Sequence, residues 1–131
     1  MSSGMTRKEM GDLGERIAKK YLEKRGFYVE RENWTDLVVY DEKPRDYFER
    51  REKSVSCEVK TSKDYIPSTP PPRQRRNSDL VAQVQIREMA QGEVSFKIRF
   101  RRYAGWGMEK MEPSLDLPLD WEEERYVIAG G

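Results

Sequence analysis

The chain has 131 residues, of which 36% are hydrophobic and 37% charged, and its 25 lysines and arginines nearly balance its 24 acidic residues. It contains one cysteine and no histidine, which excludes an intramolecular disulfide and any zinc site or catalytic dyad that needs histidine. A bound metal ion must therefore have oxygen ligands, which favours Mg²⁺, Mn²⁺ or Ca²⁺.

The length predicts a single domain over residues 1–131, with a core over about 7–103 and an irregular tail over 104–131. No segment is apolar enough to span a membrane, and no signal peptide is visible. We therefore expect a cytoplasmic protein with no membrane partner.

The first element is an amphipathic helix over residues 7–25. Thr6 and Glu9 have the spacing of a capping box, in which each side chain accepts a hydrogen bond from the other residue's backbone. Apolar residues then recur at helical spacing from Met10 to Leu22. Gly26 follows as the expected C-terminal cap.

Three strands are expected next, over residues 27–31, 36–40 and 54–61. The highly charged stretch 41–53 is predicted to be a hairpin connection at the surface. Residues 62–78 contain four prolines, which predicts a loop.

The second half is less regular. Residues 79–90 alternate in a way that favours a strand, although a helix also fits the apolar positions. Residues 96–101 predict a half-buried strand whose outer face is basic, and 125–129 a short closing strand. We expect an α/β fold: a central mixed sheet of about five strands with the first helix packed on one face.

The sequence Glu58-Val59-Lys60 lies near the end of the third predicted strand. Because strand side chains alternate, Glu58 and Lys60 share one face while Val59 points to the core. If the second and third strands pair as an antiparallel hairpin, Asp36 at the start of one lies beside Glu58 near the end of the other. Two adjacent carboxylates repel each other, and a divalent cation allows both to stay ionised.

This arrangement suits phosphodiester hydrolysis. A metal ion bound by Asp36, Glu58 and the Val59 carbonyl would polarise the phosphate and activate a water, and Lys60 would orient that water and stabilise negative charge. Glu15 falls at the edge of the helix's apolar stripe, from which it could complete the metal shell.

The chain resembles the PD-(D/E)xK nuclease superfamily, especially its small archaeal Holliday-junction resolvase-like and Mrr-like endonucleases. The resemblance rests on Gly14-Glu15 in the first helix, Gly26-Phe27 before the first strand, Asp36 and Glu58-Val59-Lys60, with Thr35 in place of the motif's proline. It implies a restriction-endonuclease-like αβββ core, a catalytic set of Asp36, Glu58 and Lys60, and Glu15 as an accessory acid. It also implies Mg²⁺ or Mn²⁺ as cofactor, DNA as substrate, a role in repair, recombination or restriction, and a homodimer.

Basic residues near the site are candidates for nucleic-acid contact, because cations neutralise phosphates. They are Lys63, Arg73, Arg75 and Arg76. Lys97, Arg99, Arg101 and Arg102 form the basic strand face, which could instead pair with the acidic tail. The alternative function is a non-catalytic nucleic-acid-binding protein that retains the nuclease fold.

Overall fold

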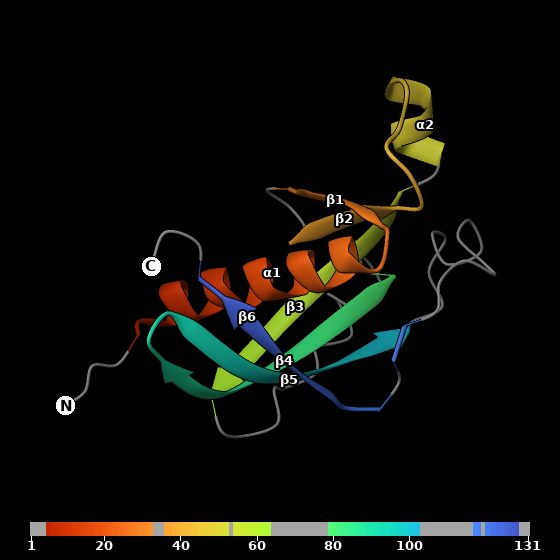
Figure 1. Ribbon diagram of the computed structural model, residues 1–131. Helices are drawn as coiled ribbons and strands as arrows, with labels where there is room; N and C mark the ends of the chain where they lie inside the picture. The colour runs from red at the N-terminus through yellow and green to blue at the C-terminus, as the bar shows by residue number, and fades with distance from the viewer. Residues whose placement is uncertain are drawn as a thin grey trace.

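The computed structural model describes residues 5–32, 36–52, 54–63, 79–102, 117–118 and 120–128 (Figure 1). The described elements, in chain order, are α1 (Arg7–Lys24), β1 (Tyr28–Arg31), β2 (Leu37–Tyr40), α2 (Tyr47–Glu52), β3 (Val55–Lys63), β4 (Leu80–Ala90), β5 (Glu93–Arg102) and β6 (Glu122–Val127). Among these residues no helix combines the length and apolar character needed to cross a bilayer.

Helix α1 begins and ends where the sequence predicts. The Thr6 hydroxyl accepts a hydrogen bond from the backbone N–H of Glu9, and the Glu9 carboxylate accepts one from Thr6, so the capping box is formed. Gly26, just after the helix, has a φ of +96°, a backbone conformation that glycine adopts without steric cost. The predicted helix over 7–25 is confirmed.

The strands form one curled mixed sheet in the order β1-β2-β3-β4-β5-β6. All neighbouring strands are antiparallel except β3 and β4, which are parallel. The α/β class with an N-terminal helix on the sheet is thus confirmed, and residues 79–90 contribute a strand. The expected count of five is wrong, because the described residues contain six strands. The closing strand spans Glu122–Val127 rather than 125–129.

The connection between β2 and β3 also differs from the expectation. Residues 41–53 do join two antiparallel strands, but they include the short helix α2. Asp46 caps this helix, accepting a hydrogen bond from the Glu49 backbone, and Arg45 pairs with Glu49 at 2.6 Å. These local contacts stabilise a helix that has almost no apolar periodicity.

Strand β3 extends to Lys63, so the predicted loop over 62–78 begins later than expected. The remainder of that loop, with Arg73, Arg75 and Arg76, lies outside the described residues.

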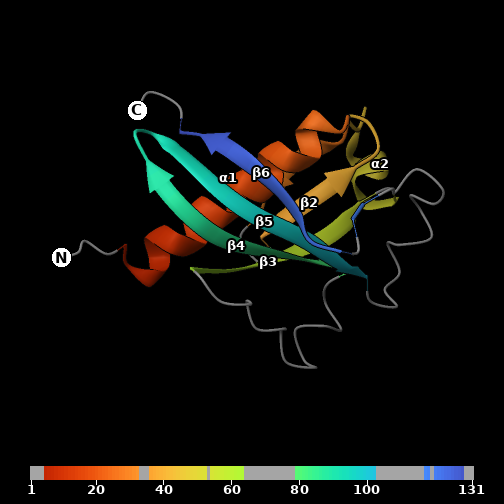
Figure 2. The same ribbon diagram turned by 60° about the horizontal axis from the view of Figure 1, so that its bottom comes forward.

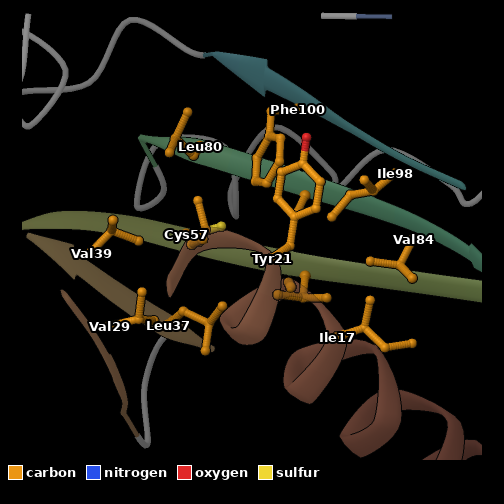
Figure 3. Packing of buried hydrophobic residues seen from close by; sticks show 14 of the residues in the cluster. Ile17, Tyr21, Val29, Leu37, Val39, Cys57, Leu80, Val84, Ile98 and Phe100 are labelled. Atoms are coloured by element: carbon orange, nitrogen blue, oxygen red, sulfur yellow. The ribbon is translucent and has the colours of Figure 1, made fainter. Parts of the chain in front are cut away.

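The two faces of the sheet have different roles. The face toward α1 carries the core, in which Ile17 and Tyr21 of the helix pack on Cys57 of β3 and Phe100 of β5 (Figure 3). The curl of the sheet also brings β6 close to α1, as both ribbon views show (Figure 2). There the Tyr21 hydroxyl donates a hydrogen bond to Glu122. The opposite face of β3 is polar and carries Ser56, Glu58 and Lys60.

Candidate metal and phosphate site

Asp36 and Glu58 meet where the pairing of β2 with β3 ends. Leu37 pairs with Cys57, so one further step along both strands brings Asp36 opposite Glu58. The two carboxyl groups are close enough for Asp36 to raise the pKa of Glu58, through its charge and as a hydrogen-bond partner. The Asp36 oxygen Oδ2 also accepts a hydrogen bond of 2.7 Å from the backbone N–H of Val59. The geometry expected from the sequence for this pair of acids is therefore present.

The environment of Glu58 raises its pKa to about 7. The main cause is partial burial, which disfavours the charged form, and the negative charge of Asp36 adds to it; Lys60 acts in the opposite direction. A bound cation would stabilise the charged form of Glu58 and so lower this pKa.

Lys60 lies two residues beyond Glu58 on the same face of β3. It is half-buried and pairs in register with Gln83 of β4. Val59, between them, directs its N–H toward Asp36, and its carbonyl lies on the same edge of the strand because a β residue turns both groups to one side. One carboxylate pair, one carbonyl and one ammonium thus converge beside the start of β2.

Glu15 reaches this region because α1 packs very closely on β3. A Cβ atom added to Gly14 would lie 1.7 Å from Thr61 Oγ1, so only glycine permits this approach. Partial burial raises the pKa of Glu15, and the nearby Asp36 charge raises it further, while Arg31 opposes the shift. Glu15 is thus near enough to Asp36 for the charge of Asp36 to affect it.

Arg31 is a component of the site that the sequence analysis did not identify. Its Nη2 donates hydrogen bonds of 2.8 Å to Glu15 Oε1 and to Asp12 Oδ1. Both acids raise the pKa of Arg31. The position of Arg31 in the sequence could have predicted this role. Arg31 ends the strand that pairs with β2, and its partner Leu37 follows Asp36 directly.

This ion pair affects the possible metal ligands. Among the described residues, no three His, Cys, Asp or Glu side chains are grouped closely enough to hold a metal ion. Asp36 and Glu58 form a pair, whereas the Glu15 carboxylate is engaged by Arg31. Mg²⁺ commonly uses one or two carboxylates and retains several waters, so the Asp36–Glu58 pair alone is a chemically reasonable donor set.

A hollow of about 660 Å³ lies beside Glu15 and Arg31. Its charged wall includes Asp12, Glu15 and Arg31, and Met5 and Ile128 contribute apolar surface. Asp36, Glu58 and Lys60 do not line this hollow, so it adjoins the ion pair of Glu15 with Arg31 rather than the Asp36–Glu58 pair.

Of the residues expected to contact nucleic acid, only Lys63 is among those described. It ends β3 as an exposed residue and pairs with Ile86. Lys63 therefore lies on the same strand as Glu58 and Lys60, beyond them along the chain.

Comparisons with models of known protein families, with curated proteins and with solved structures found no match to this chain. The similarity to PD-(D/E)xK nucleases therefore rests on the residues quoted above and on their order along the chain.

Proposed function

We propose that this chain is a divalent-metal-dependent endonuclease that hydrolyses phosphodiester bonds of DNA, in repair, recombination or restriction. The observation that carries the proposal is the close approach of Asp36 to Glu58 where β2 meets β3, with Lys60 on the same strand face as Glu58. Two adjacent carboxylates repel each other, and a divalent cation bound between them offsets that repulsion.

The donor set fits Mg²⁺ or Mn²⁺, which prefer oxygen ligands. Asp36, Glu58 and the Val59 carbonyl would hold the ion, and Glu15 would join them once released from Arg31. Such an ion polarises a phosphate oxygen and lowers the pKa of a bound water.

The chain's own groups have separate tasks in this proposal. The Val59 N–H fixes the Asp36 carboxylate, so that its orientation does not depend on the substrate. Lys60 provides a positive charge beside Glu58, from which its ammonium can orient a water and stabilise negative charge on the phosphate. The order α1, β1, β2, β3 agrees with a restriction-endonuclease-like αβββ core.

A non-catalytic DNA-binding protein is the second candidate. The observation in its favour is that two of the acids have partners without a metal ion: Arg31 pairs with Glu15, and the Val59 N–H donates a hydrogen bond to Asp36. The two candidates differ in their response to metal: the nuclease requires it for activity, whereas the binding protein does not need it to bind DNA.

The test is a cleavage assay on branched, duplex and single-stranded DNA with Mg²⁺ or Mn²⁺. We expect Asp36→Asn and Lys60→Gln to lower the cleavage rate about 100-fold or more. Asp41→Asn, at the exposed far end of β2, and Lys20→Gln, on the exposed side of α1, are matched controls that should cleave like the unmodified protein. No cleavage by the unmodified protein, or full activity of Asp36→Asn, would refute the proposal.

A further inference from the structure

On the face of the sheet opposite α1, two cross-strand rows lead from the candidate site to arginines of β5. Lys60 of β3 pairs in register with Gln83 of β4, which pairs with Arg99 of β5. The neighbouring row leads from Glu58 through Val81 to Arg101. Neighbouring strands lie about 4.8 Å apart, so Arg99 and Arg101 are about 10 Å from the backbone of β3.

Arg99 is held in place by neutral groups. Its Nε donates a hydrogen bond of 2.7 Å to Gln83 Oε1, and its guanidinium stacks 4.5 Å from the centre of the Trp121 ring. Burial lowers the pKa of Arg99, the nearby Arg101 lowers it further, and Asp120 acts in the opposite direction. A fixed, partly desolvated cation of this kind is prepared to bind an anion.

The acidic strand β6 leaves most of this face unneutralised. Glu122 and Glu124 pair across from Ile98 and Phe96, so they lie on the α1 side of the sheet. There Arg25 forms ion pairs with both of them, at 3.0 and 3.2 Å.

On the opposite face, the one acid of β6 paired with a β5 cation is Glu123, across from Lys97. Within the described part of the chain, no ion pair joins Lys97, Arg99 or Arg101 to a carboxylate. Neutralisation of the basic face by the acidic tail, which the sequence left open, is therefore largely absent among these residues.

From these contacts we infer that the face of β5 bearing Arg99 and Arg101 binds the sugar–phosphate backbone of a nucleic-acid strand that also reaches Lys60. The charge of this surface favours a nucleic acid as its ligand. In the described part of the chain its cations have no carboxylate partners, and such a row of cations complements a polyanion. The inference rests on the proposed function, which places one end of the bound nucleic acid at the candidate site. From there the nucleic acid runs across β4 to β5. Arg99 and Arg101 then neutralise phosphates beyond the one beside Lys60, and Trp121 holds the Arg99 guanidinium in position.

Fluorescence anisotropy of a labelled DNA oligonucleotide in EDTA tests this surface without any cleavage. We expect Arg101→Gln and Arg99→Gln each to weaken binding and to reduce the slope of log affinity against log salt by about 0.7–0.9. Lys20→Gln removes one charge from the other side of the molecule and should leave the slope unchanged. Arg99→Lys keeps the charge but loses the Gln83 geometry, so it should retain the slope and bind more weakly.

Absence of DNA binding at low salt, or slopes for Arg101→Gln and Arg99→Gln equal to that of the unmodified protein, would overturn the inference. Arg101 is exposed, so its substitution is compatible with the fold even if that of Arg99 is not. The two proposals fail separately. Binding with the expected slopes but no cleavage refutes the nuclease alone, and cleavage with unchanged slopes refutes the β5 surface alone.

Discussion

Glu58 connects the protonation of the site to the stability of the fold. Its pKa of about 7 in the folded chain lies above the ordinary value of 4.5, so between these values the folded state binds more protons than the unfolded state. The contribution of Glu58 to the free energy of unfolding is therefore fully present below pH 4.5 and is lost as the pH rises through about 7. The repulsion that a metal ion would relieve is one cause of this loss.

Replacing Glu58 with glutamine tests that linkage in metal-free protein. The glutamine side chain would keep the shape of the protonated carboxyl and carry no charge at any pH, so the loss of stability between pH 4.5 and about 7 should be reduced. Denaturant unfolding at both ends of this range measures the effect. Glu42→Gln, on an exposed segment, is the control. A pH dependence that is the same in Glu58→Gln and the unmodified chain would show that Glu58 does not carry this linkage.

Arg31 competes with any cation for the Glu15 carboxylate. Arg31→Gln should therefore raise Mn²⁺ affinity by about three- to tenfold, the range expected for a partly exposed ion pair. Calorimetric titration gives the affinity. Arg16→Gln is a close control, because Arg16 also pairs with Asp12, at 3.0 Å. Weaker Mn²⁺ binding by Arg31→Gln than by the Arg16 variant would contradict a competing role.

At the scale of elements, the packing of α1 on β3 determines where Glu15 lies. Thr61 Oγ1 is buried without a hydrogen-bond partner among the described residues and lies beneath Gly14, so the contact is close. Gly14→Ala should destabilise the chain by about 1–3 kcal/mol, because the added methyl group overlaps Thr61. Denaturant unfolding measures this change.

Gly11 provides the opposite expectation within the same helix. A Cβ atom there meets nothing within 4 Å, so Gly11→Ala should stabilise the chain by about 0.5–1 kcal/mol through helix propensity. Equal effects of the two substitutions would show that the approach of α1 to Thr61 does not constrain the helix.

The success of sequence reasoning varied with the strength of local signals. The capping box and apolar spacing of α1 predicted its bounds almost to the residue, and the E-x-K alternation with Asp36 predicted the meeting of two acids across β2 and β3. Strand β4 was ambiguous because both of its faces are buried from Leu80 to Ile86, so its apolar residues are nearly continuous.

Other features were missed for physical reasons. Helix α2 is stabilised by a cap and an ion pair rather than by an apolar stripe; the Asp46–Glu49 spacing was the available clue. Strand β6 begins with three acidic residues that are mostly exposed, so its sequence shows no alternation of apolar and polar residues there. The engagement of Glu15 by Arg31 depends on tertiary distances that no local pattern encodes.

At the scale of the whole molecule, the site lies where the described pairing of two strands stops. Strand β2 begins its pairing with β3 next to Asp36, and β3 continues to Lys63 with β4 as its neighbour among the described residues. The carboxylate pair thus lies at a step in the sheet, with the basic face of β5 two strands away. A homodimer that presents two such sites to two DNA strands remains a proposal, which sedimentation can test.

The proposed nuclease requires that Asp36 and Glu58 together bind a divalent ion. Crystals soaked in Mn²⁺ test it most directly, through the anomalous signal of the metal. We predict a peak in contact with both carboxylates at about 2.0–2.2 Å, and its loss in Asp36→Asn. No peak between these residues at a Mn²⁺ concentration that supports cleavage, or an undiminished peak in Asp36→Asn, would contradict the claim.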